Sequence, residues 1–425
     1  MINKPRENCG IAVSFTPVTT YKLLLRQQHR GQDMAGIASH DKDGIKVLRY
    51  AGFVDAFKPR GIVSIFGKGG KPSIGHVRYK TNCDSEMFPY LYETEGRGFK
   101  AIENIMKKIP AAYTVAILDE TGVWILRDGL GMRPGWIGKD RRGRTVVASE
   151  DTAIWEIGGE PEEELKPGHA IFIPNDPKAK YESQKVVEVK AAAGCIFELQ
   201  YLLNPNSRFH GTLAKSVREE AGRELYRLFP FSRQEMDFVT YIPYSPLDAA
   251  LTYSKESGIP FAEIFYKMNN KRAFMMPTMK EREESIKSNL YINPDYKGKL
   301  RGKRIIIKDD SMVRNVNARV AINMLFDEGV EWYGLLLYTS MIGGEIGGIM
   351  RGCHYGVAMP PSDDFATVMW GRDEENIRLH TGPKEHPLDF LGFMPHDNMV
   401  RVAGISACTY CMGGDEPVER LEIAK

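Results

Sequence analysis

The first half of the chain alternates short apolar runs with polar turns. The first run begins at Cys9, behind an eight-residue leader, and its small and β-branched residues up to Val13 predict a buried strand. A helix is predicted over 19–30, with Gly31 as its C-cap, and a short helix near 101–108. Further strands are predicted to begin at Gly36 and to cover 46–50, 61–66, 74–79, 113–118, 123–127 and 145–149. Many short strands and few helices predict a layered, mostly β unit that ends near residue 186.

The second half has a different rhythm, in which longer amphipathic segments alternate with short apolar runs. The pattern predicts helices over 212–229, 247–257 and 317–328, and strands over 238–243, 304–308 and 332–338. Such alternation predicts a mainly parallel sheet with helices on both faces. The tail from about residue 360 shows little pattern, and the chain contains no visible internal repeat.

Composition narrows the class of protein. The chain has 425 residues, of which 43% are hydrophobic and 26% charged, as expected for a globular protein of two or three domains. A formal net charge of +2 does not favour a nucleic-acid or membrane partner, and no stretch approaches the ~18 apolar residues that span a bilayer. The leader is too short and polar for a secretory signal. We therefore expect a cytoplasmic protein with small-molecule substrates, in which six cysteines serve catalysis or metal binding rather than disulfides.

Cys9 has two interpretations. It is either an ordinary buried cysteine of a first strand or the nucleophile of a processed chain. If the leader is cut after Asn8, the new α-amine of Cys9 has a pKa of roughly 7.7–8.0 and can act as the base for its own thiol.

Three other groups of residues are candidates for chemistry. Arg78 stands at a predicted strand end, where its planar guanidinium suits either an internal carboxylate or a bound α-carboxylate. Asp309 and Asp310 follow an apolar run, as a solvated turn or as ligands for ribose hydroxyls or Mg²⁺. Cys408-x-x-Cys411 fits zinc, redox chemistry or chance spacing.

Several motifs resemble one enzyme family. Four segments resemble motifs of the glutaminase domain of class II glutamine amidotransferases: Cys9-Gly10-Ile11, His29-Arg30-Gly31-Gln32, Gly75-His76-Val77-Arg78-Tyr79 and the 127–134 run RDGLGMRP. Three further segments resemble motifs of the glutamine phosphoribosylpyrophosphate amidotransferase family: Cys195-Ile196-Phe197-Glu198, Asn204-Pro205-Asn206-Ser207 and the 308–314 run KDDSMVR. This resemblance implies a leader over 1–8 and an α+β N-terminal nucleophile domain with αββα layers over 9–187. An α/β type I phosphoribosyltransferase domain with a C-terminal cluster-binding tail would then occupy 188–425.

The resemblance also implies roles for individual residues. Cys9 would attack the side-chain amide of glutamine and release ammonia, while Arg78 would hold the glutamine α-carboxylate. In the second domain, the positions implied to bind Mg²⁺ or the phosphosugar are Ser245, Asp309, Asp310, Ser311 and Arg314. A structural [4Fe–4S] cluster is implied on four cysteines, with zinc or no metal as alternatives: Cys195, Cys353, Cys408 and Cys411. Cys83 is left over, and a homo-oligomer is expected.

Two departures from the family bear on function. The family's Asn-Gly-Asn segment of the oxyanion hole and the Asp that holds the α-amine are both missing between Met87 and Phe99. Their loss together should nearly abolish ordinary glutaminase action unless Asn82 or Asn104 has been recruited. The family's Arg-Gly-Thr-Thr is Arg314-Asn315-Val316-Asn317 here; Asn315 can adopt a positive φ and Asn317 can cap the helix, but both hydroxyls are lost.

Three functions remain open. The chain is an amidophosphoribosyltransferase that makes 5-phosphoribosylamine from glutamine and phosphoribosylpyrophosphate, or an enzyme acting on another amide or phosphosugar. The third is a non-catalytic iron–sulfur protein with a binding or regulatory role. The retained leader, Cys9 and Arg78 favour an amidotransferase-like enzyme.

Overall fold

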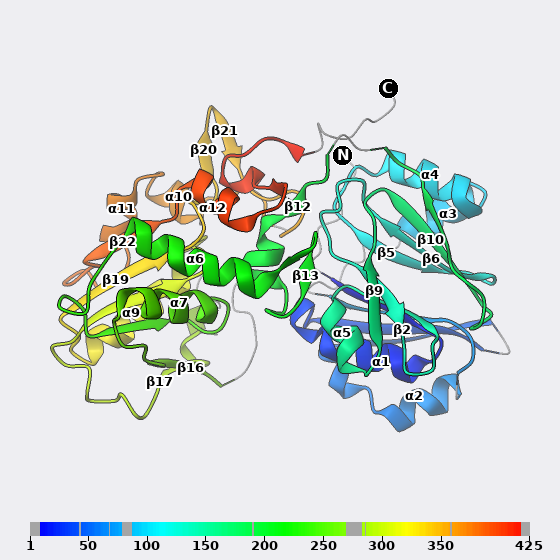
Figure 1. Cartoon of the computed structure of the whole chain (residues 1–425), viewed down its shortest axis with the longest axis horizontal. Coiled ribbons are helices and arrows are strands. Elements are labelled where there is room, and N and C mark those ends of the chain that lie inside the picture. The colour runs from blue at the N-terminus through cyan, green and yellow to red at the C-terminus, as the bar shows by residue number, and fades with distance from the viewer. Residues whose placement is uncertain are drawn as a thin grey trace.

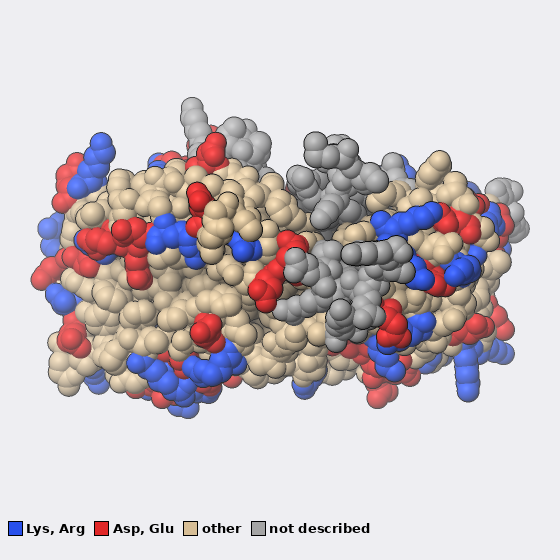
Figure 2. Space-filling view, turned by 90° about the horizontal axis from the view of Figure 1, so that it is seen from above, with Lys and Arg blue, Asp and Glu red and all other residues tan. Residues whose placement is uncertain are grey.

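The computed structural model has two lobes that lie side by side, with the N-terminal lobe on the right of Figure 1. The structure describes residues 9–41, 44–67, 69–78, 87–188, 191–268, 283–284, 286–357 and 359–417. No helix among these residues is long and apolar enough to cross a membrane. On the face seen in Figure 2, acidic and basic side chains are interspersed over both lobes, in keeping with the small net charge.

The N-terminal lobe is built on a seven-stranded antiparallel sheet. Its inner strand β1 carries the predicted apolar run after Cys9, and all five residues of β1 are buried. On either side of β1 lie β4 and β8, which supply its hydrogen bonds. The sheet order is β3 (Gly44–Ala51), β2 (Met34–Asp41), β4 (Ser73–Arg78), β1 (Gly10–Ser14), β8 (Thr145–Ala148), β7 (Trp136–Lys139) and β9 (Glu160–Glu164).

A second sheet packs face to face on the first, and helices cover the two outer faces. Ile11 and Val13 of β1 meet Ile125 and Ile171 in the core between the sheets, which confirms the expected αββα layers. The second sheet has the order β11 (Glu182–Lys185), β10 (His169–Pro174), β6 (Gly122–Arg127) and β5 (Thr114–Leu118). The first sheet is covered by α1 (Pro17–Arg26), α2 (Pro59–Phe66) and α5 (Asp151–Glu156), and the second by α3 (Met87–Thr94) and α4 (Gly98–Lys108).

Two local predictions in this lobe are wrong. Residues 61–66 form part of helix α2 rather than a strand, because Pro59 starts a helix and Ile62 and Phe66, four residues apart, face the core. Gly31 ends a 3₁₀ turn in extended conformation instead of a left-handed cap. A side chain there would place its Cβ 2.1 Å from the backbone nitrogen of Arg78, so the glycine permits close approach of β4.

The C-terminal lobe contains the predicted parallel sheet, with helices on both faces. Its order is β15 (Phe238–Tyr241), β18 (Arg304–Asp309), β19 (Trp332–Leu337) and β22 (Phe390–Phe393). One face is covered by α6 (Ala214–Leu228), α7 (Leu247–Ser257) and α12 (His396–Ala403), and the other by α9 (Val316–Asp327) and α11 (Glu374–Leu379). Smaller elements are the pairs β16 (Phe265–Lys267) with β17 (Leu290–Ile292) and β20 (Gly344–Ile346) with β21 (Ile349–Arg351), and the helix α10 (Ala366–Met369).

The C-terminal tail returns to the junction between the lobes. There β23 (Ala407–Cys408) pairs in parallel with β12 (Gly194–Cys195), which places Cys195 beside Cys408. The junction continues through a π-helical turn at Glu198–Leu202 and the two-residue strands β13 (Arg208–Phe209) and β14 (Thr212–Leu213). The tail, which shows little sequence pattern, thus supplies a sheet strand, a covering helix and two cysteines.

Candidate functional site

A cavity of about 340 Å³ opens beside Cys9, between the two sheets of the N-terminal lobe. This volume lies in the range of small-molecule sites, roughly 300–1,000 Å³. Strand register explains its floor: Ile11 on β1 pairs with His76 on β4, His76 with Gly36 on β2, and Gly36 with Arg49 on β3. Cys9 lies two residues before Ile11 and therefore on the same face of the sheet.

His76 is the imidazole in this cavity. Burial, followed by the charges of Arg78 and Arg49, lowers the pKa of His76 to about 4. His76 is thus neutral at neutral pH, and each of its ring nitrogens can only donate or only accept a hydrogen bond in a given tautomer.

Arg78 lies at the end of β4, deep in the protein, with 2% of its side chain exposed. Because β1 and β4 pair from Gly10 and Val77 onward, Cys9 and Arg78 are the next residues at the same end of the two strands. Arg78 is not among the described residues that line the cavity, although its charge acts on His76. Its predicted role in holding a substrate carboxylate stays a prediction.

Polar contacts fix the start of β1 behind Cys9. The hydroxyl of Ser149 accepts a hydrogen bond from the Ile11 amide at 2.9 Å. The Ser149 amide donates in turn to Gln27 Oε1 at 2.8 Å, and Gln27 Nε2 donates to the Ile11 carbonyl at 3.1 Å. Since Ser149 also lines the cavity, this arrangement holds the strand that carries the thiol in one position.

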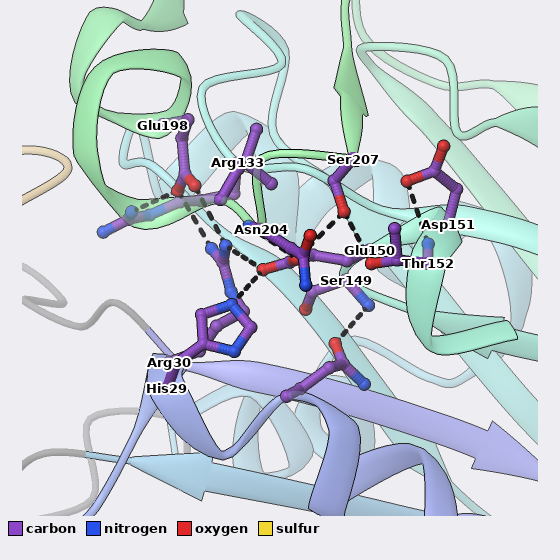
Figure 3. Close-up of polar contacts among 12 residues, drawn as sticks. His29, Arg30, Arg133, Ser149, Glu150, Asp151, Thr152, Glu198, Asn204 and Ser207 are labelled. Atoms are coloured by element: carbon purple, nitrogen blue, oxygen red, sulfur yellow. Dashed lines mark hydrogen bonds and ion pairs between the residues drawn. The ribbon is translucent and has the colours of Figure 1, made fainter. Parts of the chain in front are cut away.

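A buried ion network connects this lobe to the junction (Figure 3). Arg30 donates from Nη1 to Glu150 Oε1 at 3.1 Å and from Nη2 to Glu198 Oε1 at 2.9 Å. Arg133, which lines the Cys9 cavity, donates to the same Glu198 oxygen at 2.8 Å. His29 Nε2 lies 2.7 Å from Glu150 Oε1. Apart from His29, these side chains are no more than about 5% exposed. Their charges are therefore balanced by one another rather than by water.

Glu150 is held ionised by its neighbours. Burial alone would raise its pKa, but His29, Arg30 and the backbone amide of Asn204 outweigh burial and leave the pKa well below its usual range. Ser207 of the junction also donates its hydroxyl to Glu150 Oε2 at 3.0 Å. The Glu150 carboxylate therefore accepts hydrogen bonds from Arg30 of the N-terminal lobe and from Ser207 of the junction. The sequence analysis named Arg30, Arg133 and Glu198 only as parts of motifs. Only Glu198 carried a local signal, as a charged residue between the apolar residues Phe197 and Leu199.

The four predicted cluster cysteines meet at the junction. For Cys411, burial raises the pKa most, followed by the charges of Cys353, Cys408 and Cys195; for Cys195, burial again comes first, followed by Cys353. The Cys353 sulfur accepts backbone hydrogen bonds from Gly356 at 3.2 Å and Val357 at 3.0 Å. A side chain at Gly356 would place its Cβ 2.9 Å from the Cys195 sulfur. None of the five described cysteines forms a disulfide. Among the described residues, no three His, Cys, Asp or Glu side chains form a ready-made site for one metal ion.

A smaller cavity, of about 100 Å³, lies at the carboxyl end of β18 in the second lobe. Asp309, Asp310, Ser311 and Arg314 line it, as predicted. The hydroxyls of Ser245 and Ser311 both donate to the Asp310 carboxylate. Burial, then mutual repulsion, raises the pKa of Asp309 well above its usual value, and burial also raises that of Asp310. Two buried acids side by side favour a cation between or beside them.

Three further residues refine this site. Asn315 has φ 60° at the start of α9, as predicted, whereas Asn317 lies inside the helix and does not cap it. Arg314 donates from Nε to Asp364 at 2.7 Å. Lys308, which sequence reasoning missed, is fully buried with its Nζ 3.0 Å from the ring centre of Tyr253, and burial lowers its pKa well below the usual value.

Several predicted residues have another outcome. Asn104 does not substitute for the oxyanion hole, because it lies on α4 and donates to Glu95 at 3.0 Å, away from the cavity lining. The leader, Tyr79, Asn82 and Cys83 lie outside the described residues.

Both the sequence and the fold of this chain are similar to those of known proteins. The glutamine amidotransferase domain family matches residues 73–156. The fold matches that of the glutamine phosphoribosylpyrophosphate amidotransferase from B. subtilis complexed with ADP and GMP, with a TM-score of 0.80, 24% identity and 98% of each chain covered. The fold and the Cys9 cavity thus define a glutamine amidotransferase-type lobe joined to a phosphoribosyltransferase-type lobe.

Sequence similarity extends along nearly the whole chain. Amidophosphoribosyltransferase from Methanothermobacter thermautotrophicus is 29% identical over 477 residues, covering 97% of this chain and 95% of its own. The Methanocaldococcus jannaschii enzyme of the same name is 28% identical, covering 94% of each. The chain is therefore similar to amidophosphoribosyltransferases along nearly its whole length. An alignment of 477 positions exceeds the 425 residues of this chain, so the first relative has internal segments that this chain lacks.

Proposed function

We propose that the protein is an amidophosphoribosyltransferase-like enzyme, in which Cys9 releases ammonia from glutamine and the second lobe transfers it to phosphoribosylpyrophosphate. The observation that carries the proposal is the placement of two cavities on one chain. Cys9 opens into the first, the paired acids Asp309 and Asp310 line the second, and the Arg30–Glu198 ion pair joins their lobes.

In the first half-reaction, the Cys9 sulfur attacks the amide carbonyl carbon. The carbon–nitrogen bond breaks, the nitrogen takes a proton and leaves as ammonia, and water hydrolyses the resulting thioester to the acid. The α-amine of Cys9 would serve as base after removal of the leader. In the second half-reaction, ammonia displaces pyrophosphate from the sugar carbon and gives 5-phosphoribosylamine, the entry to purine synthesis.

Mg²⁺ is a second part of the proposal. Magnesium commonly binds one or two protein carboxylates together with substrate phosphates. Asp309 and Asp310, whose pKa values burial raises, supply such carboxylates, and Ser245 lies at hydrogen-bond distance from Asp310. When bound, the ion would neutralise the charge that develops on the departing pyrophosphate.

An iron–sulfur cluster is a third part of the proposal, and it rests on the resemblance of Cys195, Cys353, Cys408 and Cys411 to the cluster positions of the family. The four thiols act on one another electrostatically, and the Gly356 amide donates to the Cys353 sulfur, as amides do at cluster ligands. Anaerobically purified protein should show a visible absorption band that Cys408→Ser removes and Cys9→Ala retains. A full band in Cys408→Ser would contradict this assignment.

Processing and ammonia release test the main proposal. Mass spectrometry should find a chain that begins at Cys9, and the purified protein should release ammonia from an amide. Phosphoribosylpyrophosphate should then be aminated when glutamine or free ammonia is supplied. A chain that retains Met1 and turns over no amide would instead favour a non-catalytic cluster protein.

A second candidate function has the same chemistry at Cys9 but an amide substrate other than glutamine. It is favoured by the apolar lining of the Cys9 cavity and by the segments that the relative from Methanothermobacter thermautotrophicus has and this chain lacks. For either candidate we expect a cytoplasmic homo-oligomer, which size-exclusion chromatography with light scattering would test.

A further inference from the structure

The cavity that Cys9 opens continues away from the thiol as an apolar groove. Its floor on β2 is formed by Ala38 and by Gly36, over which the imidazole of His76 lies. Its outer wall is formed by Ile45 and Val47 on β3, which are 45% and 53% exposed. The facing wall is formed by Ala116 and Leu118 of β5, whose side chains point toward the first sheet, and α3 contributes Phe88 and Pro89 at the mouth.

The far end of this groove is closed by a contact between the two sheets. His40 on β2, which pairs with Ile45, forms a hydrogen bond with the Asp119 carbonyl just after β5. The groove is thus bounded at one end by this contact and at the other by the nucleophile. An occupant that reaches Cys9 with an amide and extends toward His40 would cover Ile45 and Val47 with apolar surface.

The charged residues in the described lining are all basic. Arg49 carries positive charge, the charge of Arg133 is paired with Glu198 behind the lining, and His76 is neutral at neutral pH. The described lining contains no Asp or Glu. Free glutamine carries an α-ammonium beside its α-carboxylate. An ammonium group placed here meets the charge of Arg49 and hydrocarbon, whereas a carboxylate gains Arg49 as a favourable partner.

We propose that the preferred amide donor is a glutamine whose α-nitrogen is acylated by an apolar chain. This inference rests on the proposed function, because it assumes that Cys9 is the nucleophile. Acylation removes the ammonium charge, keeps the carboxylate and supplies hydrocarbon for the groove between β3 and β5. The reaction is the one already described: sulfur adds to the side-chain carbonyl carbon, ammonia leaves, and water releases the Nα-acyl glutamate.

Three substrates separate the contributions. L-Glutamine, glutaramate, which lacks the α-nitrogen, and Nα-hexanoyl-L-glutamine are supplied to the full-length protein, and ammonia is measured. We expect kcat/KM to rise about tenfold from glutamine to glutaramate and again about tenfold to the hexanoyl compound. A value for glutamine equal to or above that for the hexanoyl compound overturns the inference.

A matched pair of variants locates the acyl chain. Val47→Thr changes the groove wall at nearly constant volume and should lower kcat/KM about fivefold to tenfold for the hexanoyl compound alone. Tyr50→Thr is the control, because Tyr50 is exposed on the same strand but contacts Phe57 on its other side. Equal losses with all three substrates in Val47→Thr, or equal effects of the two variants, contradict the placement.

The outcomes also distinguish this inference from the proposed function. Turnover of glutamine without turnover of the hexanoyl compound refutes only the acyl groove. Absence of turnover with all three, together with no thioester mass at Cys9, refutes both. Ammonia release that persists in Cys9→Ala refutes the role of the thiol on which both depend.

Discussion

The two cavities of this molecule have opposite electrostatic character. In the N-terminal lobe, the described lining of the Cys9 cavity is apolar and basic, with a histidine that stays neutral. In the C-terminal lobe, two adjacent acids are buried at a strand end and repel one another. The first cavity is suited to an uncharged or anionic organic group, and the second to a cation with phosphate.

The two lobes also position their sites in different ways. In the N-terminal lobe, Ser149 and Gln27 fix the strand that follows Cys9. In the C-terminal lobe, the acids stand at the end of β18, before the left-handed Asn315 that begins α9. The buried ion network lies between these two sites.

The largest expected effect tests whether the two cavities act in sequence. Cys9→Ala should lower ammonia release by at least about 10⁴-fold, because the covalent route is lost. Amination of the phosphosugar by added ammonium chloride should remain close to that of the unmodified protein. A parallel loss of the ammonia-dependent reaction would show that Cys9 supports the fold instead.

The second prediction concerns the network that joins the lobes. Glu198→Ala should lower the free energy of unfolding by about 3–5 kcal/mol, since it leaves Arg30 and Arg133 buried without their shared carboxylate. The control is Glu93→Ala, which breaks an exposed pair with Arg97 and should cost less than about 1 kcal/mol. Urea denaturation measures both, and similar costs would mean that the network contributes little.

The sequence predicts local features well where the signal lies within a few residues. Helix α7 matches its prediction at both ends, because Gly258 at φ 71° stops it, and Asn315 adopts the predicted left-handed conformation. Strand β22 has only four residues and is defined by pairing with β19, so no local pattern indicates it.

Features that depend on distant partners escape such reasoning. Arg30 and Glu198 are 168 residues apart, and neither sequence segment indicates the other. The apolar groove likewise arises from three strands and from β5 of the other sheet, whose facing residues are set by register. The cysteines were found from sequence only because their spacing resembles that of a known family.

A third prediction uses pH to probe the first cavity. The pKa of His76 is lowered from about 6.5 to about 4, so the unfolded chain binds a proton that the folded one resists. Stability from this group is complete above pH 6.5 and falls as the pH decreases toward 4, by at most about 3 kcal/mol. His76→Gln should flatten this part of the profile in urea titrations. An unaltered slope in His76→Gln would contradict the burial of a neutral imidazole.

The smallest effect tests the second cavity and has the opposite sign. Because burial and Asp310 raise the pKa of Asp309, the folded protein resists its ionisation, and stability falls as the pH rises above the pKa of about 4 in the unfolded chain. Asp309→Asn should therefore stabilise the protein by about 1 kcal/mol at pH 7 without magnesium, and the exposed Asp295→Asn should change little. Added Mg²⁺ should raise the unfolding midpoint of the unmodified protein and not that of Asp309→Asn. Equal midpoints at pH 7 for Asp309→Asn and the unmodified protein would show that the acids already have a compensating partner; a gain with no magnesium response would place the cation elsewhere.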